Sequence, residues 1–69
     1  MTELVREAVR DGRRVAILRC YDGDGATVVE YEAGPAGRRG TYRFRSAPEA
    51  FRFVQEALLA LQYLGCSVT

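Results

Sequence analysis

The chain has 69 residues and a mass of 7.7 kDa, which is enough for one small domain, residues 1–69, and excludes a second. Ten arginines against nine acidic residues leave a net charge of +1, far from the basic balance of a domain that depends on phosphate contacts. Apolar residues make up 48% of the chain, which argues against disorder. Many of them are alanines, so we expect a thin core that self-association would help to stabilise.

The N-terminal segment and the cysteines bear on compartment and cofactors. Residues 1–7 contain neither a basic start nor an apolar stretch of the kind that signal peptides carry, so we predict a cytoplasmic protein. The two cysteines lie far apart, without a CxxC motif and without any histidine, which excludes a zinc site and leaves no cofactor to expect. We interpret Cys20 and Cys66 as reduced thiols that behave as small apolar residues, with a disulfide between them as the alternative.

Residues 3–11 are predicted to form a short amphipathic helix. Their apolar members recur at the spacing of one helix face: Leu4, Val5, Ala8 and Val9. Thr2 would cap the start of this helix, and Gly12 would end it in the left-handed conformation.

A β-hairpin is predicted next, with strands at residues 13–21 and 26–33 joined by the turn Asp22-Gly23-Asp24-Gly25. If Tyr21 opposes Ala26 across this turn, Leu18 faces Val29 and Ala16 faces Tyr31. The alternation of apolar side chains is consistent with this register.

Residues 34–40 hold three glycines and one proline, and we predict a surface loop there. Residues 41–45 then alternate as a third antiparallel strand, with Tyr42 and Phe44 facing inward. This pairing would put Arg43 beside Glu30.

The segment Ser46-Ala47-Pro48-Glu49 has the pattern of a capping box and opens a long C-terminal helix that should end at Leu64, before Gly65. Its apolar stripe is wide, because small and large apolar residues flank the central positions Phe51, Val54, Leu58 and Leu61. One face of a three-stranded sheet would not cover all of it.

The predicted fold is therefore a two-layer α+β domain of order α-β-β-β-α, a three-stranded antiparallel meander packed on a long C-terminal helix. Apolar residues on the outer side of the sheet need cover from the first helix or from a partner chain. Six residues are the predicted interface: Phe53, Leu59 and Tyr63 on the helix, then Val15, Ile17 and Val28 on the sheet.

Catalytic chemistry finds little support in the sequence. Without histidine the chain lacks the usual general base. Asp22 and Asp24 belong to a turn, and Glu30 and Glu32 lie on one side of a strand near arginines, so both carboxylate pairs have structural explanations. We predict that the protein is not an enzyme.

Anion binding is the main alternative to protein binding. Arg38 and Arg39 lie between glycines and could hold a phosphate or carboxylate, and Arg43 and Arg45 project from the third strand. Single-stranded nucleic acid could bind along these arginines, although Glu30 and Glu32 on the same face weaken the field that phosphate binding needs.

Two families resemble the chain in layout. The order α-β-β-β-α is that of double-stranded RNA-binding domains, but the last helix starts here without the lysines of that family. The hairpin at Asp24-Gly25, the Gly-Pro loop and the helix that opens at Pro48-Glu49-Ala50 are similar in layout to HicB-type antitoxin domains, without the Pro-Gly-Cys segment of that family. The second resemblance implies a small dimeric interaction module. We predict that the protein forms a homodimer or binds a protein partner, and that it does not associate with membranes.

Overall fold

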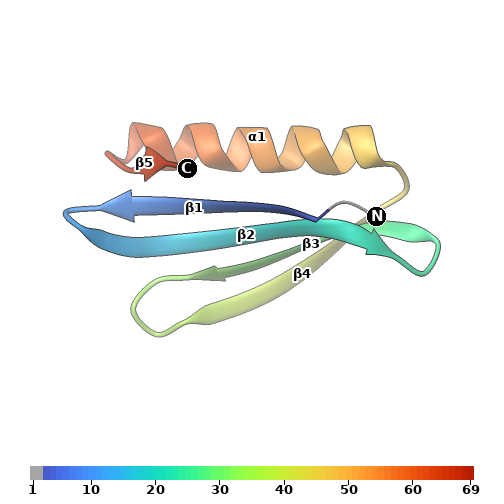
Figure 1. Ribbon diagram of the computed structural model, residues 1–69, viewed down its shortest axis with the longest axis horizontal. Helices are drawn as coiled ribbons and strands as arrows, with labels where there is room; N and C mark the ends of the chain where they lie inside the picture. Colours follow the sequence, from blue (N-terminus) through green and yellow to red (C-terminus); the bar gives the residue numbers. More distant parts are fainter. Residues whose placement is uncertain (1–2) are drawn as a thin grey trace.

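A five-stranded antiparallel sheet with one helix across one of its faces makes up the structure (Figure 1), a computed structural model that describes residues 3–69. In chain order the elements are β1 (Leu4–Arg10), β2 (Arg13–Gly23), β3 (Ala26–Ala33), β4 (Arg38–Phe44), α1 (Ala47–Tyr63) and β5 (Ser67–Val68). The strands lie side by side in the order β4-β3-β2-β1-β5. The predicted α+β class is confirmed, and the predicted meander gains a strand at its start. No helix formed by residues 3–69 is long and apolar enough to cross a membrane.

The predicted N-terminal helix is wrong, because the segment forms β1. Asp11 and Gly12 both have positive φ, 54° and 77°, as the two central residues of a tight hairpin turn require. The turn folds β1 onto β2, and Ala8 of β1 becomes fully buried. The order is therefore β-β-β-β-α-β, which removes the likeness in element order to double-stranded RNA-binding domains. The predicted cap, Thr2, lies outside the described residues.

The hairpin of β2 and β3 is present with a register two residues from the predicted one. Leu18 pairs with Tyr31 rather than with Val29, because β2 continues to Gly23 and the turn shrinks to two residues. Gly25 provides the positive φ, 69°, that so short a turn needs. A shift of two residues preserves which side chains share a face, so the inward and outward sets are as predicted.

The predicted loop at residues 34–40 is shorter in the structure, because β4 already begins at Arg38. Gly40 pairs with Tyr31 across the ladder, and a Cβ built on Gly40 would lie 2.5 Å from Tyr31 Cζ. The tyrosine ring thus lies across the glycine and covers the gap that the missing side chain leaves. Glu30 pairs with Thr41, so the predicted neighbour Arg43 is wrong.

The helix begins as predicted. Glu49 N donates to Ser46 Oγ at 3.4 Å, and Ser46 Oγ donates to Glu49 Oε1 at 3.1 Å. Leu64 caps the end, and Gly65, at φ 91°, reverses the chain. The last residues then pair with β1 as β5, a strand that the sequence did not predict.

The core lies between α1 and the face of the sheet that α1 covers. Its buried residues form two clusters, the first with Leu18, Cys20, Val29, Ala50 and Val54, and the second with Ala8, Ala16 and Cys66. Both cysteines are buried free thiols. Because most of these side chains are small, the core is as thin as the composition indicated.

Candidate interaction surface

The opposite face of the sheet has no covering helix within residues 3–69 (Figure 1). We call it the outer sheet face. It contains three rows of side chains that run across the strands. Two rows run from β1 to β4: the first is Glu7, Ile17, Glu32 and Arg39, and the second is Val5, Arg19, Glu30 and Thr41. The third row runs from β2 to β4 and consists of Tyr21, Val28 and Arg43. The rows follow from the ladder pairing, because residues that pair directly point to the same side.

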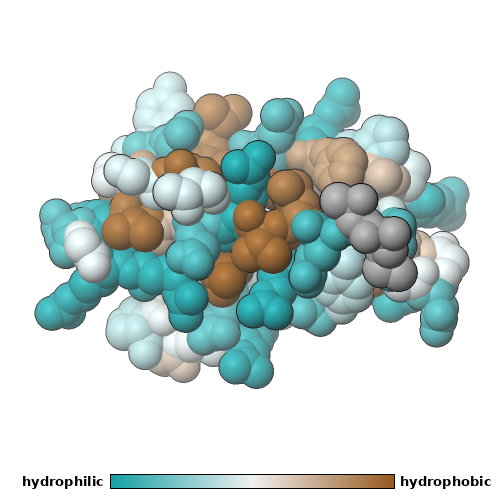
Figure 2. All heavy atoms as spheres, in the orientation of Figure 1, coloured by the Kyte–Doolittle hydropathy of each residue, from teal (hydrophilic) through white to brown (hydrophobic). Residues whose placement is uncertain are grey.

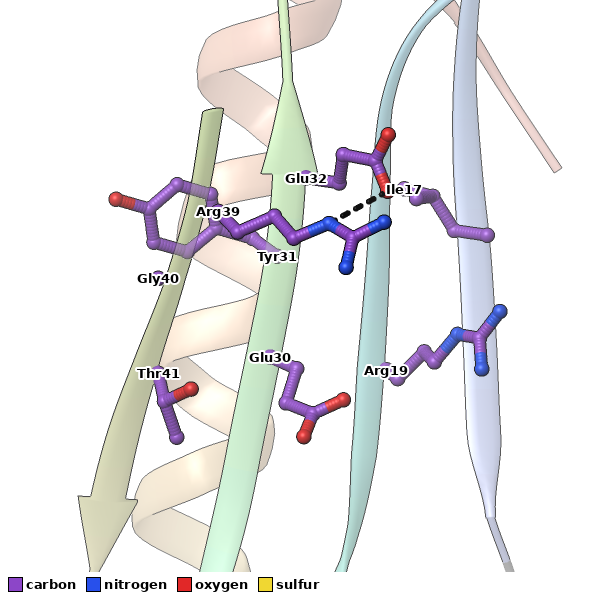
Figure 3. Close-up of a pocket in the computed structure, with 8 residues that line it drawn as sticks. All are labelled: Ile17, Arg19, Glu30, Tyr31, Glu32, Arg39, Gly40 and Thr41. Carbon is purple, nitrogen blue, oxygen red and sulfur yellow. Dashed lines mark ion pairs between the residues drawn. The ribbon is translucent and has the colours of Figure 1, made fainter. Parts of the chain in front are cut away.

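A hollow of about 280 Å³ opens at the centre of this face (Figure 3). The residues that line it are Ile17, Arg19, Glu30, Tyr31, Glu32, Arg39, Gly40 and Thr41. Across one rim, Arg39 Nε lies 3.4 Å from Glu32 Oε1. The side chain of Arg19 points toward β1, away from Glu30 (Figure 3), and forms no ion pair with the described residues.

Glu30 is held by a tyrosine. Tyr21 Oη donates to Glu30 Oε2 at 2.5 Å. This hydrogen bond to the carboxylate, with a smaller effect of burial, raises the pKa of the Tyr21 phenol above its ordinary value of 10.0. The hydrogen bond holds the carboxylate of Glu30 beside the Tyr21 hydroxyl on the outer sheet face.

The six predicted interface residues do not come together in one place. Of the sheet residues, only Ile17 is partly exposed on the outer sheet face, since Val28 is just 3% exposed and Val15 packs at a β-bulge against the second core cluster. On the helix, Leu59 and Tyr63 are exposed, at 57% and 93%.

Phe53, the remaining predicted interface residue, belongs to an aromatic cluster within the chain. The centroid of its ring lies 4.8 Å from that of Tyr42 and 5.3 Å from that of Phe44. Its apolar surface is therefore largely used in holding α1 on β4.

Val5 is an exposed apolar residue of the outer sheet face that the sequence did not indicate. It is 44% exposed and lies diagonally next to Ile17 on the outer sheet face. Figure 2 shows apolar side chains gathered over β1 and β2, among hydrophilic ones. The signal that would have found Val5 was Asp11-Gly12, a hairpin dipeptide that requires a strand before it.

The four candidate arginines line up along one edge of the sheet. Arg38, Arg39 and Arg43 belong to β4, and Arg45 follows directly. Arg39 is paired with Glu32, and Arg43 Nη2 donates to the carbonyl oxygen of Asp24 at 3.2 Å. Arg38 and Arg45 are exposed.

Metal ligands and nucleophilic thiols are the remaining candidates for chemistry among the described residues. Residues 3–69 bring together no group of three or more histidine, cysteine, aspartate or glutamate side chains that would hold a metal ion. Burial, and to a smaller extent the charge of Asp22, raises the pKa of the Cys20 thiol, which disfavours the nucleophilic thiolate. Comparison of the chain with protein-family models, with curated proteins and with solved structures gave no match.

Proposed function

We propose that this protein is a non-enzymatic, homodimeric interaction module whose two copies pack outer sheet face against outer sheet face. The observation that carries the proposal is the one-sided cover of the sheet: α1 protects the inner face, and the outer sheet face presents Val5 and Ile17 to solvent. A core this thin gains stability from any further apolar burial, at about 25 cal/mol per Å².

The charges of the outer sheet face support self-pairing in one orientation. Their sign alternates from strand to strand, with Arg39 and Arg43 on β4, Glu30 and Glu32 on β3, Arg19 on β2 and Glu7 on β1. A two-fold axis parallel to the strands, between β2 and β3, would lay β4 over the partner's β1 and β3 over the partner's β2, so that opposite charges meet. An axis perpendicular to the strands would lay β4 over β4 and oppose like charges, which costs affinity.

Binding of nucleic acid along Arg38, Arg39, Arg43 and Arg45 has weaker support. On the outer sheet face three arginines are balanced by three glutamates, and Arg39 is already paired with one of them. Phosphate binding depends on an excess of positive charge. A labelled single-stranded oligonucleotide tests it: binding that falls steeply with salt and is lost in the Arg38→Ala, Arg39→Ala double variant would favour this alternative over the dimer.

The first experiment is the solution mass of the reduced, untagged protein by size-exclusion chromatography with light scattering over a wide concentration range. We expect a mass near twice 7.7 kDa. Ile17→Asp places an unpaired charge in the interface and should yield a folded monomer. The matched control, Tyr63→Ser on the exposed side of α1, should stay a dimer.

Two outcomes would overturn the proposal. A monomeric wild-type protein at every concentration excludes self-association. A dimer that survives Ile17→Asp, and is lost in Tyr63→Ser, moves the interface to α1. Far-UV circular dichroism of each variant separates loss of the dimer from loss of the fold.

A further inference from the structure

One edge of the sheet carries an unpaired strand. β4 is the outermost strand, and no described residue pairs with its free side, whereas β5 covers part of β1 at the opposite edge. A seven-residue strand in this position presents a row of backbone N–H and C=O groups that another strand can pair with.

The two faces of β4 differ in chemistry. Arg39, Thr41 and Arg43 point to the outer side, and Tyr42 and Phe44 point to the side of α1. Arg45, which is exposed, follows β4 directly. No acidic residue interrupts residues 38–45. Pairing of β4 with a second copy of β4 would bring arginines together, so the strand that fits here is an acidic one.

A groove lined by aromatic and charged side chains lies beside the inner side of β4. It has a volume of about 440 Å³, and its lining residues are Phe44, Pro48, Glu49, Arg52, Phe53 and Glu56. The rings of Phe44 and Phe53 form its apolar floor, and Tyr42, 44% exposed, extends it along the strand. Side chains that an added strand directs inward would lie over these rings.

The strand that already pairs with β4, on its other edge, indicates what sequence a second partner strand would have. There β3 directs Val29 and Tyr31 inward and Glu30 and Glu32 outward, and Glu32 forms its ion pair with Arg39. This alternation of apolar and acidic residues matches both faces of β4. No described residue occupies the free edge, which has the same apolar inner side. On its outer side Arg39 and Arg43 also contact Glu32 and the carbonyl oxygen of Asp24, so an added strand would share these arginines with β3 and its turn.

We propose that the free edge of β4 binds an extended peptide in which acidic and apolar residues alternate. The peptide adds a sixth strand, with its acidic side chains beside the outward arginines and its apolar side chains in the groove between β4 and α1. The proposal concerns the edge of the sheet and does not depend on pairing of two outer sheet faces.

The probe is a synthetic peptide with the sequence of residues 27–33, Thr-Val-Val-Glu-Tyr-Glu-Ala, acetylated and amidated at its ends. It is titrated into the whole ¹⁵N-labelled protein and followed by NMR. Amide shifts should concentrate on residues 38–45 and on the first half of α1. Replacing both glutamates of the peptide with glutamine should weaken binding by about fivefold.

Two N-methylated peptides test the backbone pairing. Methylation at alternate residues blocks one row of peptide N–H groups or the other, and only one of the two peptides should lose binding, because a single row faces β4. In the protein, Arg43→Ala combined with Arg45→Ala should weaken binding, whereas the matched control Arg13→Ala with Arg14→Ala, at the turn between β1 and β2, should not.

The inference is overturned if millimolar peptide leaves the β4 amides unmoved, if shifts spread through β2 because the peptide replaces β3, or if both methylated peptides bind equally. Shifts of the same amides by a single-stranded oligonucleotide, without any by the peptide, would assign the edge to nucleic acid instead. Repeating the titration with Ile17→Asp separates this inference from the dimer, since peptide binding should persist there.

Discussion

Replacing Gly40 with alanine tests the packing of Tyr31 across β4. The new Cβ would lie 2.5 Å from Tyr31 Cζ, and carbon atoms pack at about 3.5–4.0 Å, so the ring must move by about 1 Å or more. Its movement is limited, because the ring stacks on Tyr42 with centroids 5.7 Å apart. Gly40 does not have positive φ, so its backbone accepts alanine and the steric overlap is the only cost.

The magnitude follows from two opposing effects. Overpacking costs about 1–3 kcal/mol, and the loss of unfolded-state freedom on changing glycine to alanine returns about 0.4–1 kcal/mol. We expect Gly40→Ala to lower the free energy of unfolding by about 1–2 kcal/mol. In a domain of this size that lowers the midpoint of thermal unfolding by roughly 4–8 °C per kcal/mol. Urea and thermal unfolding, followed by far-UV circular dichroism, measure both quantities.

A double-mutant cycle isolates the contact. In a Tyr31→Ala background the methyl group of Gly40→Ala meets no ring, and the substitution should stabilise the protein by about 0.4–1 kcal/mol. The opposite signs in the two backgrounds are the expected result. Equal stabilisation in both would refute the reasoning, because it would mean that the ring does not lie across Gly40.

Three further predictions concern the turn, the cap and the tyrosine pair. Gly12→Val should lower the free energy of unfolding by about 1–2 kcal/mol in urea titrations, because residue 12 has positive φ, and Gly12→Asn should lower it less. Ser46→Ala should cost about 1 kcal/mol through loss of the N-cap, measured in the same way, and a cost of zero would contradict the capping role. The raised pKa of Tyr21 means that the folded state holds the phenol proton more tightly than the unfolded chain, so this contribution is complete below pH 10 and is lost as pH rises through the raised pKa. Tyr21→Phe should therefore flatten the fall in stability at alkaline pH, and an unchanged profile would rule out the hydrogen bond to Glu30 as its source.

Local chemistry alone was enough to predict the hairpin of β2 and β3 and the start of α1. The glycine turn at residue 25 and the alternation in β2 and β3 produce a hairpin with the correct faces, and Ser46 with Glu49 marks the start of α1. The register was two residues off because side-chain alternation distinguishes only odd from even shifts. The number of residues in the turn, which depends on the backbone conformation, decides between registers that differ by two residues.

The spacing of apolar residues in β1 is compatible with both a helix and a strand. Leu4, Val5, Ala8 and Val9 fit one face of a helix, and over seven residues they also tolerate a strand. Gly12 was correctly predicted to need positive φ, but that need is shared by a helix end and a hairpin turn. Pairing with β2, which buries Ala8, decides for the strand.

The sequence by itself determined the class of the fold, the thin core, the boundaries of the long helix and the side of the sheet to which each side chain of β2 and β3 points, because these depend on spacing and on capping chemistry along a single segment. Only the tertiary structure decided that residues 4–10 form a strand and that Ser67 and Val68 extend the sheet. It also decided that Phe53 packs against Tyr42 and Phe44, that Val28 is buried within the outer sheet face, and that Val5 is exposed there. These outcomes depend on which segments meet in space. A short strand and a partly buried side chain are stabilised by contacts with neighbouring segments rather than by the local sequence.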